Sequence, residues 1–434
     1  MNERSGNSDV NRSAAVLEDV ASWLDDHWDP KMPLRHWWEC LGLAGWARPD
    51  WPVEWFGKGL TAADGLAVTR AIHRYGAIGG PTGFGANMGG PTLLAHGDDD
   101  QRRRHLRGMV TGVDAYCQLF SEPNAGSDLA GLQTRAELDG GAWVINGQKV
   151  WSSRAATANK ALVLARTNVD APKHAGISYF LVDLRQSGVE VRPLREMTGR
   201  SHFNEVFLND VRVDRDDLIG GEGKGWQVAS STLEFERALS SGHGDVLDAP
   251  EPGELAGNLD RPAGEFAKGG FGGVGAKQSS FDRLVAYTQS NGSASDPKIR
   301  DGLVRLYAID RLNVVTNDRA RALQADGGDL PGFANIGKMA QSHTARLGRD
   351  LTFAILGPLG TLHDYNAKSS QAIVDVTGKS ELPELIYDAL WAQGPPIYGG
   401  SDQIQRNIIG ERILGLPREP GPSSATPFRD LPKN

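Results

Sequence analysis

The stretch FSEPNAGSDLAG, residues 120–131, decides how this sequence is read. It stands where a helical pattern gives way to short β-rich runs. Its glycines allow the backbone to approach a ligand closely, and Ser121 and Ser127 supply hydroxyl groups that suit a polar ligand. Taken alone, the stretch is also ordinary turn chemistry, so its meaning depends on the rest of the chain.

On either side of this stretch the hydrophobic period changes. Helical spacing is found on the N-terminal side over residues 14–28, 66–76 and 101–112. Short β-rich runs separated by turn residues follow, over residues 136–153, 160–168, 177–184 and 204–213. Helical character returns over residues 225–242, 300–323 and 335–356. Because the helical and β segments are segregated, the sequence predicts an α+β fold.

These changes predict the domain boundaries. We expect a disordered N-terminus over residues 1–13, a helical domain over 14–115, a β domain over 116–222 and a second helical domain over 223–416. Residues 240–280 are rich in Gly, Asp and Pro and lack periodicity, which predicts a mobile insertion. Residues 417–434 form an irregular tail.

Composition narrows the class of protein. The chain has 434 residues and a net charge of −8, which disfavours nucleic acid or an anionic membrane as a partner. The two cysteines, Cys40 and Cys117, have no metal-ligand spacing around them and fit a reducing compartment. Without a signal peptide or an apolar run of membrane-spanning length, the sequence predicts a cytoplasmic protein.

Two apparent ligand motifs are set aside, and the histidines provide none. GFGGVG at 270–275 has the letters of a dinucleotide fingerprint, but no strand precedes it and no helix pattern follows. TGKS at 377–380 lacks the first glycine of a phosphate-binding loop, because Ile373 takes its place. The histidines form no metal-ligand pair, so no metal is expected.

Several segments in a fixed order carry a resemblance. After residues 120–131 come INGQKVWSS (145–153), FNEVFLNDVRV (203–213), GGEGKGW (220–226), STLEFER (231–237) and IYGGSDQIQRNIIGERILGLPREP (397–420). Together they resemble the acyl-CoA dehydrogenase family. The resemblance implies an N-terminal helical domain, a β-barrel middle domain and a C-terminal helical bundle, with FAD between the last two. It further implies oxidation of an acyl-CoA thioester to the trans-2-enoyl-CoA, with an electron-transferring flavoprotein as electron acceptor.

Matching positions give the site residues that the resemblance implies. Ser127 is expected to bind the thioester arm of the substrate, with Leu233, Arg237 and Tyr398 also on the substrate side. The cofactor side comprises Phe120, Ser121, Trp151, Ser153, Gly357, Gly360, Ile397, Tyr398, Ser401 and Gln403. For Trp151, a buried strand tryptophan with no role is the alternative.

The catalytic base is not where most of the family has it. Removal of an α-proton needs a carboxylate, and much of the family has glutamate directly after the tyrosine of the 397–401 turn, where this chain has Gly399. Gly399 keeps its backbone N–H, which serves the thioester oxygen. By resemblance to isovaleryl-CoA and long-chain dehydrogenases, the base moves to Glu236, directly before Arg237. The alternatives are a surface Glu–Arg pair, or a chain without an active base.

Two departures concern assembly. The family's Arg-x-x-Phe-Gly run is out of register in residues 290–302, and Phe353 replaces the glutamine of its Gln-x-x-Gly-Gly run. Both belong to the half of the FAD site that a second subunit supplies, so the sequence leaves open a homo-oligomer or a hetero-oligomer with a related subunit. Two further alternatives are a non-catalytic or half-site subunit, and a flavin oxidase or monooxygenase on the same fold. The insertion predicts a bulky or branched acyl group, or has no role.

Overall fold

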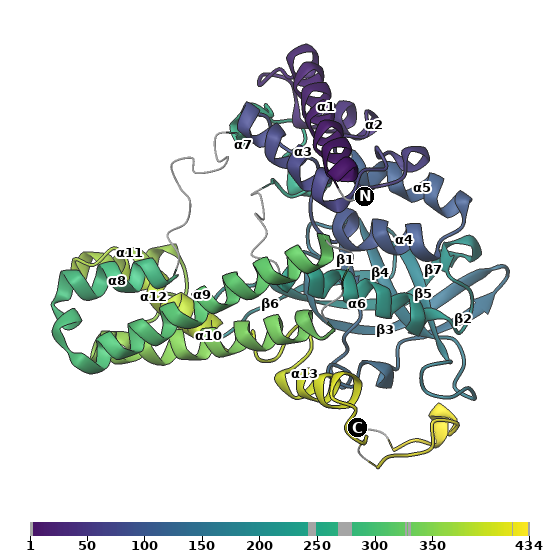
Figure 1. Ribbon diagram of the computed structural model, residues 1–434. Coiled ribbons are helices and arrows are strands. Elements are labelled where there is room, and N and C mark those ends of the chain that lie inside the picture. Colours follow the sequence, from purple (N-terminus) through teal and green to yellow (C-terminus); the bar gives the residue numbers. More distant parts are fainter. Residues whose placement is uncertain are drawn as a thin grey trace.

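The computed structural model describes residues 3–241, 249–267, 280–325, 328, 331–418 and 420–432. Helices pack on a central sheet, and a separate arm of helices projects away from it (Figure 1). The N-terminal helices are α1 Glu3–His27, α2 Leu34–Leu43, α3 Ala62–Tyr75, α4 Gly90–His96 and α5 Asp99–Val110, with a π-helical turn at Gly85–Gly89. The C-terminal helices are α6 Gly225–Ser241, α7 Gly264–Ala267, α8 Ser280–Asn291, α9 Pro297–Ala325, α10 Phe333–Leu356, α11 Ala367–Thr377, α12 Leu382–Trp391 and α13 Asp402–Ile408.

The middle of the chain forms one barrel-like sheet. Its strands are β1 Tyr116–Leu119, β2 Arg135–Asp139, β3 Ala142–Ser153, β4 Lys160–Arg166, β5 Ile177–Asp183, β6 Val189–Leu194, β7 Phe203–Asp214 and β8 Leu218–Ile219. The strand order is β6-β7-β3-β2-β4-β5-β8, and β1 pairs in parallel with β4. This sequence of helices, sheet and helices confirms the α+β prediction.

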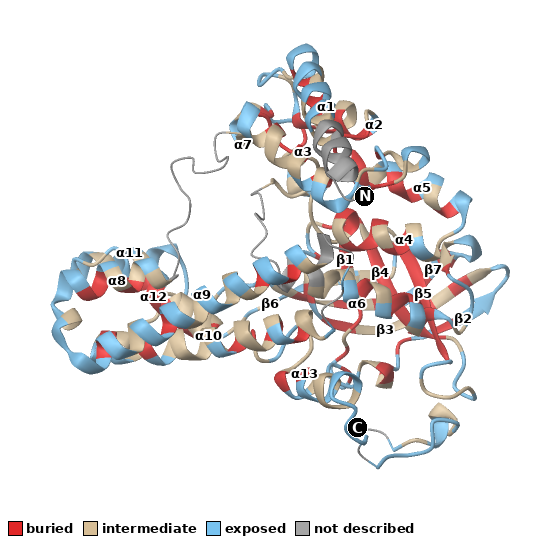
Figure 2. Cartoon of the chain, in the orientation of Figure 1, coloured by how far each residue is buried: buried red, intermediate tan, exposed pale blue. Residues whose placement is uncertain are grey.

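Strand β4 has both faces buried, as Figure 2 shows for the central strands. Side chains alternate along a strand, so neighbouring residues face opposite sides of the sheet. Ala161, Val163 and Ala165 belong to the core enclosed by the sheet. Leu162 and Leu164 belong to a second core that also includes the N-terminal helices and the start of α6. This double burial explains why the run KALVLAR is almost continuously apolar.

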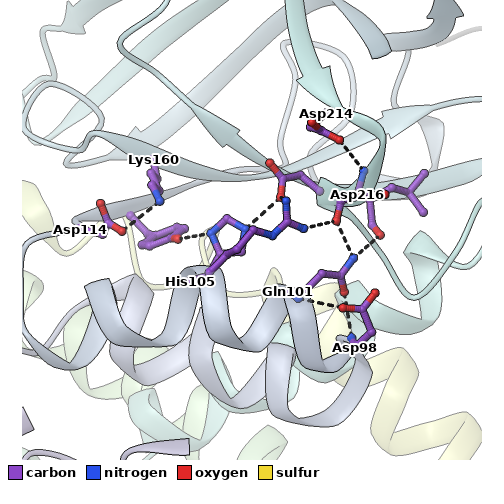
Figure 3. A network of polar contacts seen from close by, with 11 residues as sticks. Asp98, Gln101, His105, Asp114, Lys160, Asp214 and Asp216 are labelled. Carbon is purple, nitrogen blue, oxygen red and sulfur yellow. Dashed lines mark hydrogen bonds and ion pairs between the residues drawn. The ribbon is translucent and has the colours of Figure 1, made fainter. Parts of the chain in front are cut away.

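A polar network joins α5 to the sheet (Figure 3). Asp98 caps α5 by accepting a hydrogen bond from the backbone of Gln101, and the Gln101 side chain donates to the backbone carbonyls of Asp216 and Leu218. One turn on, His105 contacts the Asp217 carboxylate at 3.0 Å. The N-terminal helices are therefore fixed to the strand that leads into α6.

The expectation of a mobile insertion over 240–280 is wrong for residues 249–267. Backbone N–H groups of Leu34 and Arg35 donate to carbonyls of Arg261 and Leu259, and Ala263 donates to Met32. The side chains of Leu259 and Ala263 are buried in the core of the N-terminal helices. Residues 249–267 are ordered because they pack on the N-terminal helices. Such packing does not require a regular spacing of apolar residues, so the sequence shows no periodicity there. Residues 242–248 and 268–279, including most of the insertion's glycine-rich part, lie outside the described residues.

Truncation of Leu259 tests this docking. Leu259 is 2% exposed, and Leu255, four residues earlier on the same segment, is 59% exposed. We expect Leu259→Ala to lower the free energy of unfolding by about 2–5 kcal/mol, the usual loss for a buried leucine. Leu255→Ala, the matched control, should change it by less than about 0.5 kcal/mol. Urea unfolding of both variants measures this, and equal small effects would mean that the segment is not docked.

Both chain ends also differ from expectation. Helix α1 begins at Glu3, so the described part of the N-terminus expected to be disordered is helical. Extending a helix costs less than starting one, and the amphipathic turns after Ala14 supply the nucleus. The tail after residue 416 is irregular as described, but its residues 427–429 pack on the β domain.

The projecting arm has a core of its own. It consists of α8, α11, α12 and the parts of α9 and α10 that lie furthest from the sheet (Figure 1). Buried residues in it include Leu284, Leu306, Leu351 and Leu385. The arm meets the β domain along α12. In its first turn Glu384 pairs with Arg200 at 3.1 Å, and at its C-terminal end Trp391 stacks on Phe203.

Candidate active site

Two of the sequence motifs meet at the junction between the sheet and the C-terminal helices. Ser127 lies in the turn after β1, and Ser401 begins α13. Their hydroxyl oxygens are 3.5 Å apart although 274 residues separate them in the chain. The fold thus brings the 120–131 stretch and the 397–401 turn to one place.

A buried ion pair holds the 120–131 turn. Lys149, which is fully buried, contacts the Glu122 carboxylate at 2.8 Å and also donates to the carbonyl of Phe120 at 3.1 Å. Glu122 further accepts backbone hydrogen bonds from Gln133 and Thr134. Burial opposes ionisation of Glu122, but the charge of Lys149 and these donors outweigh it and lower the pKa of the carboxyl group. Sequence reasoning missed this pair, which shapes the backbone of Phe120 and Ser121.

The double glycine has a conformational explanation. Gly399 and Gly400 have φ of +61° and +82°, in the left-handed region that residues with a side chain seldom adopt. The Gln405 side-chain amide donates to both of their carbonyls, at 3.0 and 3.3 Å. A Cβ atom at Gly399 would lie 3.3 Å from the side chain of Lys338. The turn therefore favours glycine at both positions, and a side chain at 399 would point toward Lys338.

The side chain of Lys338 packs against the 397–401 turn. The sequence analysis did not single this residue out. It is buried on α10, and its Nζ donates to the carbonyl of Pro395 and lies 5.7 Å from the centre of the Tyr398 ring. Burial lowers the pKa of Lys338, although the nearby Asp402 carboxylate partly opposes that effect. Burial likewise raises the pKa of the Tyr398 hydroxyl. The turn thus carries a cation and a neutral phenol at its inner side.

Aromatic rings line the same junction. Trp151 is 56% exposed and has φ of +61°, so the reading of a buried strand tryptophan is wrong. Its ring packs edge-on against Phe203 with the centres 5.7 Å apart, and Phe203 stacks on Trp391 at 5.9 Å. Trp391 in turn lies 6.3 Å from Tyr398. An exposed tryptophan held in a rare backbone conformation favours a role in binding a flat ligand.

Glu236 lies on the inner face of α6. Its carboxylate accepts a hydrogen bond of 3.4 Å from the side chain of Gln118 on β1, whereas Glu234 is exposed. Burial raises the pKa of Glu236, and the Gln118 hydrogen bond and the charge of Arg237 only partly offset this. A partly buried carboxylate with a raised pKa fits a general base better than a surface ion pair.

The other predicted site residues differ in how far they are buried. Leu233 packs against the core shared with the N-terminal helices, and Arg237 is partly buried, which lowers its pKa. Ser153 ends β3, close in sequence to Trp151. The side chain of Ile397 is 70% exposed, and Gln403 is also exposed.

Gly357 and Gly360 lie apart from this cluster. They follow α10 at its far end, in the arm. The rise of about 1.5 Å per residue along α10 places Gly357 roughly 28 Å from Lys338. The two glycines therefore cannot line the junction of Ser127 with Ser401 in the same chain.

The excluded motifs have no counterpart at this junction. Thr377 ends α11 and Gly378 caps its C-terminus with φ of +68°, which is the wrong end of a helix for phosphate binding. Residues 270–275 lie outside the described residues. Within the described ranges, no three His, Cys, Asp or Glu side chains are grouped to hold a metal ion, and no helix has both the length and the apolar character to cross a membrane.

Comparison with known proteins settles the family. Models of the N-terminal, middle and C-terminal domains of acyl-CoA dehydrogenases match residues 13–113, 117–211 and 269–414. The acyl-CoA dehydrogenase IpdE1 of Mycobacterium tuberculosis is 36% identical over 386 residues, which cover 89% of this chain and 88% of that protein. The chain belongs to the acyl-CoA dehydrogenase family. Members of this family are oxidoreductases.

Two further proteins are similar to this chain, the acyl-CoA dehydrogenase FadE34 and the ChsE4–ChsE5 complex. FadE34 of Mycobacterium tuberculosis is 34% identical over 382 residues, which cover 87% of this chain but only 46% of that protein. The solved ChsE4–ChsE5 complex of the same organism shares the fold, with a TM-score of 0.62 and 25% identity over 94% of this chain and 98% of that one.

The raised pKa of Glu236 has a consequence for stability. A carboxyl group whose pKa is higher in the folded than in the unfolded state makes the folded protein bind more protons between the two values. The contribution of Glu236 to the free energy of unfolding is therefore present at low pH, and it is lost as the pH rises through the pKa that Glu236 has in the folded protein. We expect Glu236→Gln to melt at an equal or higher temperature than wild type at neutral pH, with the advantage shrinking toward acidic pH. Thermal unfolding across pH checks this, and a lower melting temperature at neutral pH would contradict it.

Proposed function

We propose that this chain is an FAD-dependent acyl-CoA dehydrogenase that forms the trans-2-enoyl-CoA, with Glu236 as the base. The observation that carries the proposal is the Glu236 carboxylate, partly buried against Gln118 at 3.4 Å while Gly399 leaves the other candidate position bare. An α-proton of a thioester is weakly acidic, so its removal needs a desolvated carboxylate near the carbon. Burial supplies that desolvation here.

The residues at the junction fit a flavin. The exposed Trp151 ring, the aromatic group of Phe203 and Trp391, and the bare Gly399–Gly400 backbone leave a flat and partly apolar surface. Ser121 follows β1, Ser153 ends β3, and the Ser401 hydroxyl caps α13. In addition, the Oγ atom of the neighbouring Ser152 is buried without a hydrogen-bond partner among the described residues. We assign Phe120, Ser121, Trp151, Ser153, Tyr398 and Ser401 to cofactor binding.

In the proposed reaction, different residues of the chain have different roles. FAD, when bound, supplies the acceptor for the β-hydride. Glu236 takes the α-proton and must be ionised to do so. The backbone N–H of Gly399 donates to the thioester oxygen as negative charge develops there. Ser127 binds the thioester arm, and Lys338 keeps the Tyr398–Gly399 turn in place.

The position of Gly357 and Gly360 supports a shared site. Since they lie roughly 28 Å along α10 from Lys338, they serve a cofactor only if it belongs to another subunit. Two of the relatives are consistent with a related, unlike partner: FadE34 is long enough to hold a second unit of this size, and ChsE4–ChsE5 is a complex of two differently named chains. We propose that a related subunit completes the FAD site, and that an electron-transferring flavoprotein accepts the electrons.

The test is anaerobic addition of acyl-CoA thioesters to the purified protein, alone and coexpressed with a related subunit encoded nearby. The panel runs from short straight chains to branched and ring-bearing acyl groups. Loss of the visible flavin absorbance with at least one thioester supports a dehydrogenase. A colourless protein in both preparations, or bound flavin that no thioester bleaches, argues for a non-catalytic subunit. Rapid reaction of the reduced flavin with oxygen would instead indicate an oxidase or monooxygenase.

A further inference from the structure

The end of the chain returns to the β domain after leaving α13. Backbone N–H groups of Phe428 and Arg429 donate to the carbonyls of Ala171 and Val169, and Pro427 forms a β-bridge with Pro172. The Arg429 side chain pairs with Asp170 at 2.7 Å. These contacts fix residues 427–429 on the loop after β4. The family's C-terminal domain model ends at residue 414, so the returning segment lies outside it.

Arg166 is the centre of this attachment. Its guanidinium carbon lies 3.3 Å from the centre of the Phe428 ring, within cation–π range. The same group donates to the carbonyls of Ala130, Leu132 and Lys173, at 2.7, 3.1 and 3.0 Å. Burial lowers the pKa of Arg166 to about 10. The Arg166 guanidinium thus donates hydrogen bonds to the backbone of residues 130–132. The Phe428 ring covers one face of its plane.

From Arg166 the contacts run back to the 120–131 turn. Lys173, whose carbonyl Arg166 holds, contacts both carboxylate oxygens of Asp128, at 2.7 and 2.6 Å. Asp128 directly follows Ser127, whose hydroxyl lies 3.5 Å from that of Ser401. Two side chains therefore stabilise the turn. Arg166 donates to the backbone of residues 130–132, and Lys173 pairs with the Asp128 carboxylate.

We propose that Phe428 is a positioning residue for substrate binding, acting through Arg166 on the turn that carries Ser127. This inference rests on the proposed function for the role of Ser127. The tail follows the π-helical turn Ile409–Ile413 after α13, whose N-cap is Ser401. Its residues 427–429 dock on the loop after β4, which Arg166 and Lys173 link to the turn that carries Ser127. Through these non-covalent contacts the tail is a second connection across the junction that the two serines span. Loss of the Phe428 ring does not change Glu236 on α6. We therefore expect it to weaken binding of the acyl-CoA and to leave the rate of proton abstraction unchanged.

The test uses the full chain, with any subunit it requires, in three forms. Phe428→Ala removes the ring, Phe428→Tyr keeps it, and Ser424→Ala alters an exposed residue of the same tail as a matched control. We expect Phe428→Ala to raise KM for the acyl-CoA about tenfold, the effect of losing one desolvated cation–π contact, with kcat within twofold. Phe428→Tyr and Ser424→Ala should behave as wild type. An unchanged KM in Phe428→Ala, even with a lower melting temperature, overturns the proposal.

A second measurement does not depend on turnover. We expect amide hydrogen exchange in residues 125–134 to be faster in Phe428→Ala than in wild type, and unchanged in Ser424→Ala. If no variant turns over but this exchange differs, the proposed function fails while the link from Phe428 to the turn stands. If residues 125–134 exchange at the wild-type rate in Phe428→Ala, the link itself is absent and the inference is wrong.

Discussion

Glu236→Gln is expected to lower kcat/KM for the acyl-CoA by about 10²–10⁴-fold, the usual contribution of a general base. Glutamine keeps the size of the side chain and a hydrogen-bonding partner for Gln118, but it cannot accept the α-proton. FAD binding should be unchanged, because Glu236 lies on α6 and the residues assigned to the flavin lie on the sheet and the 397–401 turn. Turnover with the best thioester of the panel and flavin content per chain are the two measurements.

Glu234→Gln is the matched control for this result. It makes the same chemical change two residues earlier on the same helix, at an exposed position. It should retain wild-type turnover. If both variants remain active, the base lies elsewhere. If Glu236→Gln loses its flavin as well as its activity, Glu236 has a structural role and the assignment fails.

The raised pKa of Glu236 also sets a pH dependence. The base works only when ionised, so kcat/KM should rise with pH as Glu236 loses its proton. Because burial raises its pKa, the rise should be centred above the value of about 4.3 for an ordinary glutamate. A pH–rate profile for wild type shows this limb, and it should be missing from the residual activity of Glu236→Gln.

Lys149→Met is expected to have the largest effect on stability. It removes the ammonium group that pairs with the Glu122 carboxylate at 2.8 Å, and breaking a buried pair from one side usually costs about 3–5 kcal/mol. Because Lys149 also donates to the carbonyl of Phe120, the backbone at Phe120 and Ser121 should loosen and flavin should dissociate more readily. Urea unfolding and flavin retention during gel filtration measure the two effects.

Two comparison variants separate pairing from general damage. Adding Glu122→Gln to Lys149→Met removes the uncompensated charge, so the double variant should regain part of the lost stability. Arg192→Met breaks the exposed pair with Glu190, whose charged atoms are 2.7 Å apart, and should lower the free energy of unfolding far less than Lys149→Met, because water screens an exposed pair. Equal losses in Lys149→Met and Arg192→Met would show that burial of the pair is unimportant.

Sequence reasoning succeeded where local pattern and spatial role coincide. The changes of period from helix to strand and back are set by each element's own buried face, so they predicted the α+β class. The double glycine was singled out, and both glycines have left-handed φ values, a conformation that favours glycine. Glu236 was selected over Glu234 by its place beside Arg237. Its carboxylate accepts a hydrogen bond from Gln118, and its role as the base stays a prediction.

What could not be predicted depends on distant partners. Residues 249–267 and 427–429 have no periodicity because each is held by docking, through Leu259 and Phe428, on surfaces far away in the sequence. The same holds for Lys338, an ordinary helical lysine until α10 packs under the 397–401 turn. Trp151 was expected to have either a cofactor role or a buried strand position, and its exposure in the structure excludes the buried position.

The two-sided burial of β4 bears on how the protein comes apart. A strand whose alternate side chains belong to two cores cannot leave one without exposing the other, so the N-terminal helices, the sheet and the start of α6 form one cooperative unit. The arm has a separate core that includes Leu284, Leu351 and Leu385, so its opening would leave the two cores that share β4 intact. We therefore expect the folding units to differ from the three domains of the family, because the N-terminal helices and the sheet are joined through β4.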